Sequence, residues 1–396
     1  MGVCAAFLRA RLIPWCASSS SALLLQVSMA KDGAVKVFVP GRVCLLGEHT
    51  DWSSTYGPQN KQLTGNGHCL VYGTDLGLYA DVCPTPPEGP NAGKMVFSST
   101  VDDGSHKELV VDFEENALES HAKNGDDFFS YMCGTVAVML RDDKVKTKLQ
   151  PLRIHNYETT LPIQKGLSSS AAVCVLVVES FNKVFDLNLT VDEIMDFAYR
   201  GEIDTPSQCG RMDQCVAFGR VCTSMRFKDG QLTCSRVHIP KDCTFYFVVA
   251  DLRRHKDTPL ILKSLNGAFP LAKNEIEQNV QLYLDRLSLE FSNAAERALE
   301  LGDAKSLGEI CVAAQASFKT HLTPICPQEL SAPKLYSVLE NEKILQHVYG
   351  GKGVGSQGDG SVQFVCKDEN SQREVVRILN EELECHAFAM KLSGEV

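Results

Sequence analysis

The chain has 396 residues, of which 44% are hydrophobic and 22% are charged, and its formal net charge is −10. This composition is typical of a globular protein with a large core, and the length favours two domains or two fused lobes. The negative charge argues against nucleic acid as the main partner, since proteins that bind nucleic acid usually carry a basic surface. A small anionic ligand stays compatible, because a pocket can be locally positive in an acidic protein.

The 16 cysteines are scattered among apolar neighbours, as in Val43-Cys44-Leu45, and no CxxC pair occurs. This pattern favours reduced, buried thiols over a disulfide framework or a zinc site. No apolar run reaches about 18 residues, so neither a transmembrane helix nor a membrane partner is expected.

Residues 1–33 are expected to form a leader that precedes the folded chain. The first 30 residues contain Arg9, Arg11 and a run of serines, but no acidic residue. Such a composition fits an organelle transit peptide, and the alternatives are a disordered leader or a true start at Met29. The expected location is therefore the cytoplasm, or a plastid or another organelle if this segment is a transit peptide.

Alternating apolar residues predict a β-rich beginning, in which Pro40-Gly41 ends the first strand. The expected strands lie at residues 35–39, 43–46, 69–72, 78–82, 95–98 and 108–113. Residues 53–67 are rich in small and polar residues and are expected to form a loop, and residues 127–140 have the spacing of a helix.

The middle and the end of the chain mix strands and helices without strict alternation, which favours an α+β fold over a doubly wound parallel sheet. A strand at residues 152–157 leads into a glycine-serine turn at 166–170. Thr190 and Glu193 have the spacing of a capping box for a helix that ends near Gly201. The other expected elements are helices at 171–185, 271–301, 304–320 and 371–384, strands at 245–250 and 362–366, and a glycine-rich segment at 350–361.

The first segment that can carry chemistry is the glycine-serine turn before an apolar helix. It reads Gly166-Leu167-Ser168-Ser169-Ser170-Ala171-Ala172. Small residues let the backbone approach a ligand, and the N-terminus of a helix attracts anions, so the turn suits the phosphates of ATP. It is not a Walker A motif, because no Gly-Lys-Ser/Thr follows. The alternative is a core helix capped by serine.

Two further segments place charged residues beside buried strands or turns. The segment at residues 40–52 contains Arg42, which could neutralise a phosphoryl group in transfer. It also contains Glu48, His49 and Asp51, which could accept hydrogen bonds from a polyol; a surface ion pair is the alternative. In the segment at residues 202–214, Asp213 follows a glycine-containing turn and could orient or deprotonate a hydroxyl group, unless it is a surface or capping residue.

Together the three segments resemble the GHMP kinase superfamily from about residue 35 to the C-terminus. Residues 41–52 and 209–214 are similar to galactokinase segments, although Cys44 and Trp52 stand where asparagine and tyrosine are usual. Residues 326–330 are similar to another galactokinase segment. The resemblance implies an α+β, two-lobed GHMP kinase fold, with a ribosomal-S5-like lobe at 34–225 and a ferredoxin-like lobe at 226–396.

The resemblance also implies roles for individual residues, with ATP and Mg²⁺ as the cofactors and a small sugar as the partner. Asp213 would be catalytic, and Arg42 would steady it and the γ-phosphate. Ser170 and Glu202 would coordinate Mg²⁺. The phosphates would lie against residues Gly166, Leu167, Ser168, Ser169, Ser170 and Ala171, and the sugar hydroxyls against Glu48, His49, Asp51 and Asp213.

One departure from the family lies at residues 350–361, where the glycines are kept but Lys352, Gln357 and Asp359 are added. We expect this loop to pack against the phosphate loop and the substrate, with its polar residues tuning substrate choice. The long loop at 53–67 is a second departure. Both put galactose itself in question without removing kinase activity.

The function expected is transfer of the ATP γ-phosphate to a hydroxyl, preferentially the anomeric one, of a monosaccharide or sugar acid. A mevalonate-type kinase is an alternative, although Glu48 and Asp51 would repel an anionic substrate. A non-catalytic sensor of sugar and ATP is another, and a purely structural module would not need Arg42, Glu202 and Asp213 together.

Overall fold

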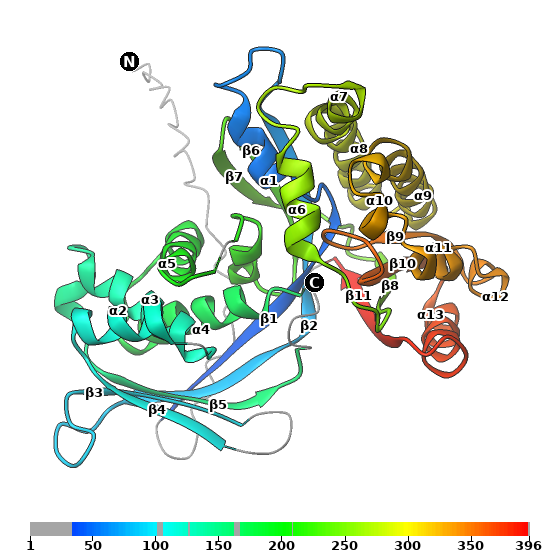
Figure 1. Ribbon diagram of the computed structural model, residues 1–396. Coiled ribbons are helices and arrows are strands. Elements are labelled where there is room, and N and C mark those ends of the chain that lie inside the picture. Colours follow the sequence, from blue (N-terminus) through cyan, green and yellow to red (C-terminus); the bar gives the residue numbers. More distant parts are fainter. Residues whose placement is uncertain (1–33, 101–105, 126, 162–166, 208, 395–396) are drawn as a thin grey trace, which may run out of the picture.

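The computed structural model describes residues 34–100, 106–125, 127–161, 167–207 and 209–394. The expected leader and Gly166 therefore lie outside the described residues. None of the described helices is long and apolar enough to cross a membrane. The elements form two sheets with helices packed on them, as the α+β prediction requires (Figure 1).

The first sheet is mixed and is organised around one long strand, β2. Its strands follow the order β4 (His106–Asp112), β3 (Lys94–Thr100), β5 (Leu152–Thr159), β2 (Asn66–Pro84), β6 (Cys222–Lys228) and β7 (Gln231–Arg236). β1 (Val35–Leu46) pairs with β2 outside this path, and only the β3–β5 pair among these is parallel. In sequence, this sheet extends from Val35 to Arg236; the lobe boundary expected at residue 225 stays a prediction.

Helices cover one face of the first sheet (Figure 1). They are α2 (Glu115–Asn124), α3 (Phe129–Arg141), α4 (Ser169–Val184) and α5 (Val191–Ile203). α4 packs against β1 and β2, and its run of apolar residues is buried, as the sequence predicted. The predicted capping box at Thr190 and Glu193 is confirmed at the start of α5.

The second sheet has four antiparallel strands, in the order β11 (His386–Ser393), β8 (Thr244–Asp251), β10 (Ser361–Cys366) and β9 (Val348–Gly353). The helices of this part are α6 (Thr258–Asn266), α7 (Glu275–Leu282), α8 (Ser288–Glu300), α9 (Ala304–His321), α10 (Pro327–Leu330), α11 (Pro333–Leu339), α12 (Glu342–Leu345) and α13 (Glu369–Arg377). π-helical turns follow α7 and α13, at Tyr283–Leu287 and Ile378–Glu382. Short helices elsewhere are α1 (Thr50–Ser53) and the 3₁₀ turns Ser54–Tyr56, Lys146–Lys148, Asp213–Phe218 and Thr323–Ile325.

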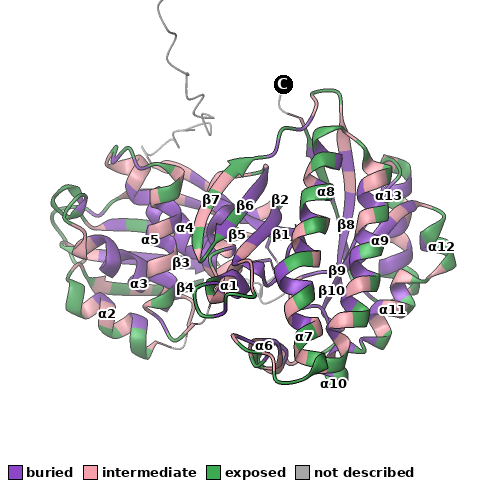
Figure 2. Cartoon of the chain, turned by 90° about the horizontal axis from the view of Figure 1, so that it is seen from above, coloured by how far each residue is buried: buried purple, intermediate pink, exposed green. Residues whose placement is uncertain are grey.

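One cluster of buried hydrophobic residues extends over both sheets. Figure 2 shows buried residues in strands of each sheet. Tyr72 of the first sheet stacks on Phe247 of the second, with ring centroids 4.9 Å apart. Gln363 of β10 also donates hydrogen bonds to the backbone carbonyls of Cys44 and Leu45 in β1, at 2.9 and 3.1 Å. The position of β1 is therefore fixed by both halves of the molecule.

Two strand boundaries predicted from the sequence are wrong. Pro40-Gly41 does not end a strand: Pro40 pairs with Gly77 and Arg42 with Gly73, and the register shifts between them. Such a bulge bends a strand without ending it, and it changes the direction of the side chain that follows. The strands expected at 69–72 and 78–82 are likewise one strand, β2, because β1 pairs along both parts.

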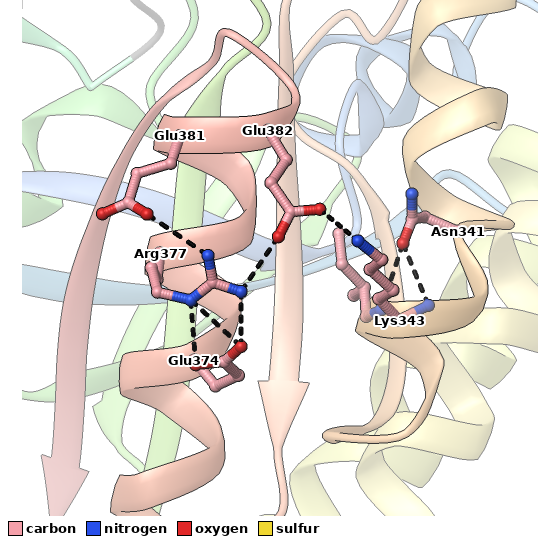
Figure 3. Close-up of polar contacts among 7 residues, drawn as sticks. Asn341, Lys343, Glu374, Arg377, Glu381 and Glu382 are labelled. Atoms are coloured by element: carbon pink, nitrogen blue, oxygen red, sulfur yellow. Dashed lines mark hydrogen bonds and ion pairs between the residues drawn. The ribbon is translucent and has the colours of Figure 1, made fainter.

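A cluster of ion pairs joins the C-terminal end of α13 to α12 (Figure 3). Arg377 contacts Glu374, Glu381 and Glu382, with nitrogen–oxygen distances of 2.7, 3.2 and 2.9 Å. Lys343 of α12 contacts Glu382 at 2.6 Å. These side chains are partly to well exposed, so solvent screens their charges and the cluster contributes little to stability.

Candidate active site

A cleft of about 970 Å³ is lined by most of the site residues that were predicted from the sequence. The predicted site residues that line it are Arg42, Glu48, His49, Asp51, Ser168, Ser169, Ser170 and Asp213. Leu167 and Ala171 are instead buried in the hydrophobic interior, where their side chains help to anchor α4. Glu202 is 1% exposed and lies behind the lining.

Asp213 and Arg42 are in direct contact in this cleft. Arg42 follows the bulge of β1, and Asp213 begins the 3₁₀ turn Asp213–Phe218. The Arg42 Nε–H donates to Asp213 Oδ1 at 3.0 Å, and a second guanidinium N–H donates to the same oxygen. Burial opposes the charge on Arg42, but the Asp213 carboxylate outweighs it, so the pKa of Arg42 is raised. The Arg42 guanidinium group thus holds the Asp213 carboxylate in a fixed orientation.

The N-terminus of α4 opens into the same cleft. Ser168 precedes the helix in the left-handed conformation, with φ 59° and ψ 49°. The first N–H groups of an α-helix have no partner within the helix, and they attract anions together with the helix dipole. The Ser168 hydroxyl is buried and has no hydrogen-bond partner among the described residues. These N–H and hydroxyl groups can donate hydrogen bonds to phosphate oxygens.

Glu202 lies in the last turn of α5, and the side chain of Ser170, the second residue of α4, is near enough to act on the pKa of its carboxyl group. Gln214 Nε2 also donates to Glu202 Oε2 at 2.8 Å. Burial and then the charge of Asp213 raise the pKa of Glu202 to about 7. Hydroxyl and carboxylate oxygens are the ligands that Mg²⁺ prefers, and a cation would relieve the repulsion between the carboxylates. Ser170 and Glu202 therefore fit the expected metal.

Glu48 forms a buried ion pair with Lys352 of β9. Their residues are 8% and 1% exposed, and Lys352 also donates to the carbonyl of Gly353 at 2.7 Å. Glu48 is therefore charge-balanced within the protein. The ion pair with Lys352 therefore removes the repulsion that Glu48 was expected to exert on an anionic substrate. The repulsion expected from Asp51 is weaker too, because burial and the charge of Asp213 raise the pKa of its carboxyl group to about 6.

The expectation for residues 350–361 is wrong in part. The stretch is not one loop, because its beginning belongs to β9 and pairs with β10. Gln357 accepts a hydrogen bond from Gln315 at 2.9 Å, and Asp359 accepts one from the N–H of Leu335 at 2.8 Å. These two side chains are occupied by structural contacts, whereas Gly355, Ser356, Gly360 and Ser361 line the cleft.

A tight turn after β1 positions His49. Gly47 has φ +94°, and a Cβ there would lie 1.9 Å from the carbonyl oxygen of His68, so only glycine fits. His49 is 6% exposed, and its Nδ1 accepts a hydrogen bond from Trp52 Nε1 at 3.3 Å. Indole N–H groups only donate, so the proton of neutral His49 is on Nε2. That Nε2 has no partner among the described residues.

The lowered pKa of His49 predicts that the folded protein loses stability in mild acid. Burial, followed by the charges of Lys256 and Lys352, lowers its pKa from 6.5 to about 4. The unfolded chain takes up this proton at a higher pH than the folded protein does, so stability is full above about pH 6.5 and is lost as the pH falls toward 4. We expect His49 to contribute about 2 kcal/mol to the loss of unfolding free energy between about pH 7.5 and pH 5.

Urea unfolding of His49→Gln at these two pH values measures this contribution. The variant should show a smaller pH dependence than the wild type, whereas substitution of the exposed His386 should leave the dependence unchanged. An equal pH dependence in His49→Gln and the wild type would contradict the assignment.

Sequence reasoning missed several residues that line the cleft, among them Asp251, Arg254, His255 and Lys256. They belong to a charged run that begins at the last residue of the buried strand β8 and continues directly after it. A run of charges at the end of an interior strand was the available signal. Asp127, Phe128 and Tyr131 line the cleft from the α3 side, and no comparable signal marked them.

Comparisons with known proteins agree with this geometry. Residues 130–220 match the model of the GHMP kinases N terminal domain. The galactokinase of Thermotoga maritima is 24% identical over 338 residues, which cover 81% of this chain and 84% of that protein. Other galactokinases align over a shorter part, 42 and 44% of their own length.

Solved structures with the same fold include two kinds of kinase. Galactokinase of Lactococcus lactis, solved with galactose, has a TM-score of 0.69 at 17% identity and covers 94% of this chain and 96% of its own. Mevalonate kinase of Methanococcus jannaschii has a TM-score of 0.64 at 18% identity, covering 92% and 100%. The chain therefore has the GHMP kinase fold, and its resemblance to this superfamily is confirmed. Within the superfamily, its sequence is galactokinase-like.

Proposed function

We propose that the protein is an ATP-dependent kinase that transfers the γ-phosphate to a hydroxyl group, preferentially the anomeric one, of a monosaccharide or sugar acid. The observation that carries the proposal is the Asp213–Arg42 pair, which lies in the same cleft as the N-terminus of α4. A carboxylate that can receive a proton and a site that can hold phosphates thus occur together. The proposed lobes are residues 34–225 and 226–396, and the proposed location is the cytoplasm, or an organelle if residues 1–30 are a transit peptide.

In this proposal the acceptor hydroxyl donates a hydrogen bond to Asp213. The carboxylate orients the hydroxyl and takes its proton as the oxygen attacks the γ-phosphorus. The bond from the γ-phosphorus to the bridging oxygen breaks, and ADP leaves with that oxygen. Arg42 fixes the orientation of the Asp213 carboxylate and places positive charge beside the phosphoryl group. The N–H groups at the start of α4 and the hydroxyls of Ser168 and Ser169 hold phosphate oxygens. Phosphoryl transfer passes through a loose transition state, so positioning and charge neutralisation are the larger contributions.

Ser170 and Glu202 would hold Mg²⁺, which neutralises charge on the phosphate oxygens when it is bound. Glu48, His49 and Asp51 would surround the acceptor. Because Asp51 has a raised pKa and lies beside the segment that precedes Asp213, it is well placed to accept or donate a hydrogen bond at a sugar hydroxyl. No nucleic acid or membrane takes part in the proposed reaction.

A mevalonate-type kinase is a second candidate, and one observation favours it. The Lys352–Glu48 ion pair removes a charge that would have repelled the carboxylate of mevalonate. The fold likeness to mevalonate kinases is compatible with either acceptor.

Formation of ADP from ATP should be measured with galactose, arabinose, fucose, galacturonate, glucuronate, heptoses and mevalonate as acceptors. Acceptor-dependent ADP formation with at least one sugar is expected, and Asp213→Asn protein purified in parallel should show none above background. Turnover of mevalonate alone would favour the second candidate. Binding of ATP without turnover of any acceptor would overturn the kinase proposal in favour of a sensor.

A further inference from the structure

The part of the cleft formed by the segment after β8 contains a cation whose charge is not used by the proposed phosphoryl transfer. Lys256 is partly buried and lines the cleft. Its Nζ donates to the hydroxyl of Ser356 at 3.0 Å and to the carbonyl of Gln357 at 3.2 Å. Both partners are uncharged. The partners of Lys256 Nζ among the described residues are thus a hydroxyl and a carbonyl group, and the charge of Asp251 also acts on it.

The glycine-rich stretch after β9 is shaped around this lysine. A Cβ on Gly360 would lie 2.7 Å from both Cε and Nζ of Lys256, and a Cβ on Gly358 would lie 3.7 Å from Lys256 Cβ. Any larger side chain at position 360 would displace the ammonium group. Burial lowers the pKa of Lys256 to about 8, so the side chain is still mainly charged near neutral pH.

His49 supplies a second donor to the same cleft. Its Nε2–H is buried and has no partner in the described part of the chain. His49 and Lys256 line the same cleft, and the charge of Lys256 helps to lower the pKa of His49. A buried donor without a partner is unfavourable, so a ligand that accepts its hydrogen bond gains affinity. An anionic oxygen group is the ligand that suits an ammonium group and a neutral N–H donor together.

Two of the carboxylates that line the cleft are paired with cations other than Lys256. Glu48 is neutralised by Lys352, and Asp213 is paired with Arg42. Asp251 accepts a hydrogen bond from the N–H of Arg253 at 3.0 Å, and Arg254 and His255 also line this part of the cleft. The segment 251–256 therefore presents more positive than negative charge to an acceptor.

We infer that Lys256 and the Nε2–H of His49 form a carboxylate subsite, which makes an acidic sugar, a uronic acid, the acceptor rather than a neutral hexose. The inference rests on the proposed sugar kinase function and specifies its substrate class. Binding of the carboxylate at this end of the cleft would leave a ring hydroxyl free to reach Asp213. The subsite would then choose the acceptor, whereas Asp213 and α4 carry out the transfer.

The first test compares acceptors with the wild-type protein. Galacturonate or glucuronate should have a KM about 10- to 100-fold lower than galactose, the range expected for a hydrogen bond to a charged group. A neutral sugar that is used as well as either uronate would overturn the carboxylate subsite and leave the kinase proposal standing. Absence of turnover with every acceptor would instead overturn the kinase proposal itself.

Variants then assign the effect to Lys256. Lys256→Met should lower kcat/KM for the uronate by about 10- to 100-fold, mainly through KM, and should change kcat/KM for galactose little. Lys256→Arg should restore part of the loss. Gly360→Ala should act in the same direction as Lys256→Met, because its Cβ displaces the ammonium group.

The matched control is Lys263→Met, on the exposed face of α6, which should leave both acceptors unchanged. Equal losses for uronate and galactose in Lys256→Met would show a structural role and would overturn the inference. An unchanged KM for the uronate in Lys256→Met would overturn it as well.

Discussion

Asp213→Asn should reduce kcat by about 10²- to 10⁴-fold, the range that a positioned general base contributes. Asparagine has the same shape as aspartate and keeps an oxygen for Arg42, but it cannot accept the proton of the acceptor hydroxyl. The proposed phosphate-binding part of the cleft lies at α4, away from the substituted side chain. Nucleotide affinity, measured by calorimetry, should therefore change by only a few-fold.

Two measurements keep this result interpretable. Thermal unfolding of Asp213→Asn shows whether loss of the carboxylate beside Arg42 has reduced the folded fraction. Asp192→Asn, on the exposed surface of α5, removes an equal charge away from the cleft and should retain full turnover. A folded Asp213→Asn protein with turnover within a few-fold of wild type would contradict the catalytic role of Asp213.

Lys352→Met should lower the unfolding free energy by about 3–5 kcal/mol, because it leaves the carboxylate of Glu48 buried without its cation. Both residues of the pair are at least nine-tenths buried, so water can replace little of the lost interaction. Methionine has a similar length, so the change in packing volume is small. Urea unfolding of the purified variant measures the loss.

The double variant Glu48→Gln/Lys352→Met separates charge from packing. It removes the unpaired carboxylate and should recover much of the lost stability, since a buried ion pair is often worth no more than neutral groups of similar shape. Lys343→Met removes the cation of an exposed ion pair with Glu382 (Figure 3) and should change stability much less than Lys352→Met. Equal effects of Lys343→Met and Lys352→Met would contradict the importance of burial at Glu48.

The residues that sequence reasoning placed correctly carry local signals or distinctive motifs. The capping box at Thr190 and Glu193 involves residues three apart, so the sequence contains the whole of it. Arg42 and Asp213 lie 171 residues apart and are nevertheless in contact. Their spacing in the sequence does not indicate this contact. The prediction that both belong to one site came from the resemblance of their motifs to one superfamily.

The features that sequence reasoning missed or misjudged depend on contacts with residues far away in the sequence. Glu48 and Lys352 are 304 residues apart, and nothing near Glu48 in the sequence indicates a cation. Pro40-Gly41 has the local character of a turn, but pairing with β2 carries the strand through it as a bulge. The glycines of β9 disfavour a strand locally, yet Gly351 is needed there, because a Cβ would lie 2.5 Å from the ring of Phe364.

The shared core beneath the cleft has a consequence for how the molecule unfolds. The Tyr72–Phe247 stack and the hydrogen bonds from Gln363 to β1 join segments that are far apart in the sequence. Neither sheet can therefore melt without exposing apolar surface on the other, so a single cooperative transition is favoured over stepwise loss of two independent modules. A chain divided at residue 225 would be cut within β6, and each fragment would lose part of the same core.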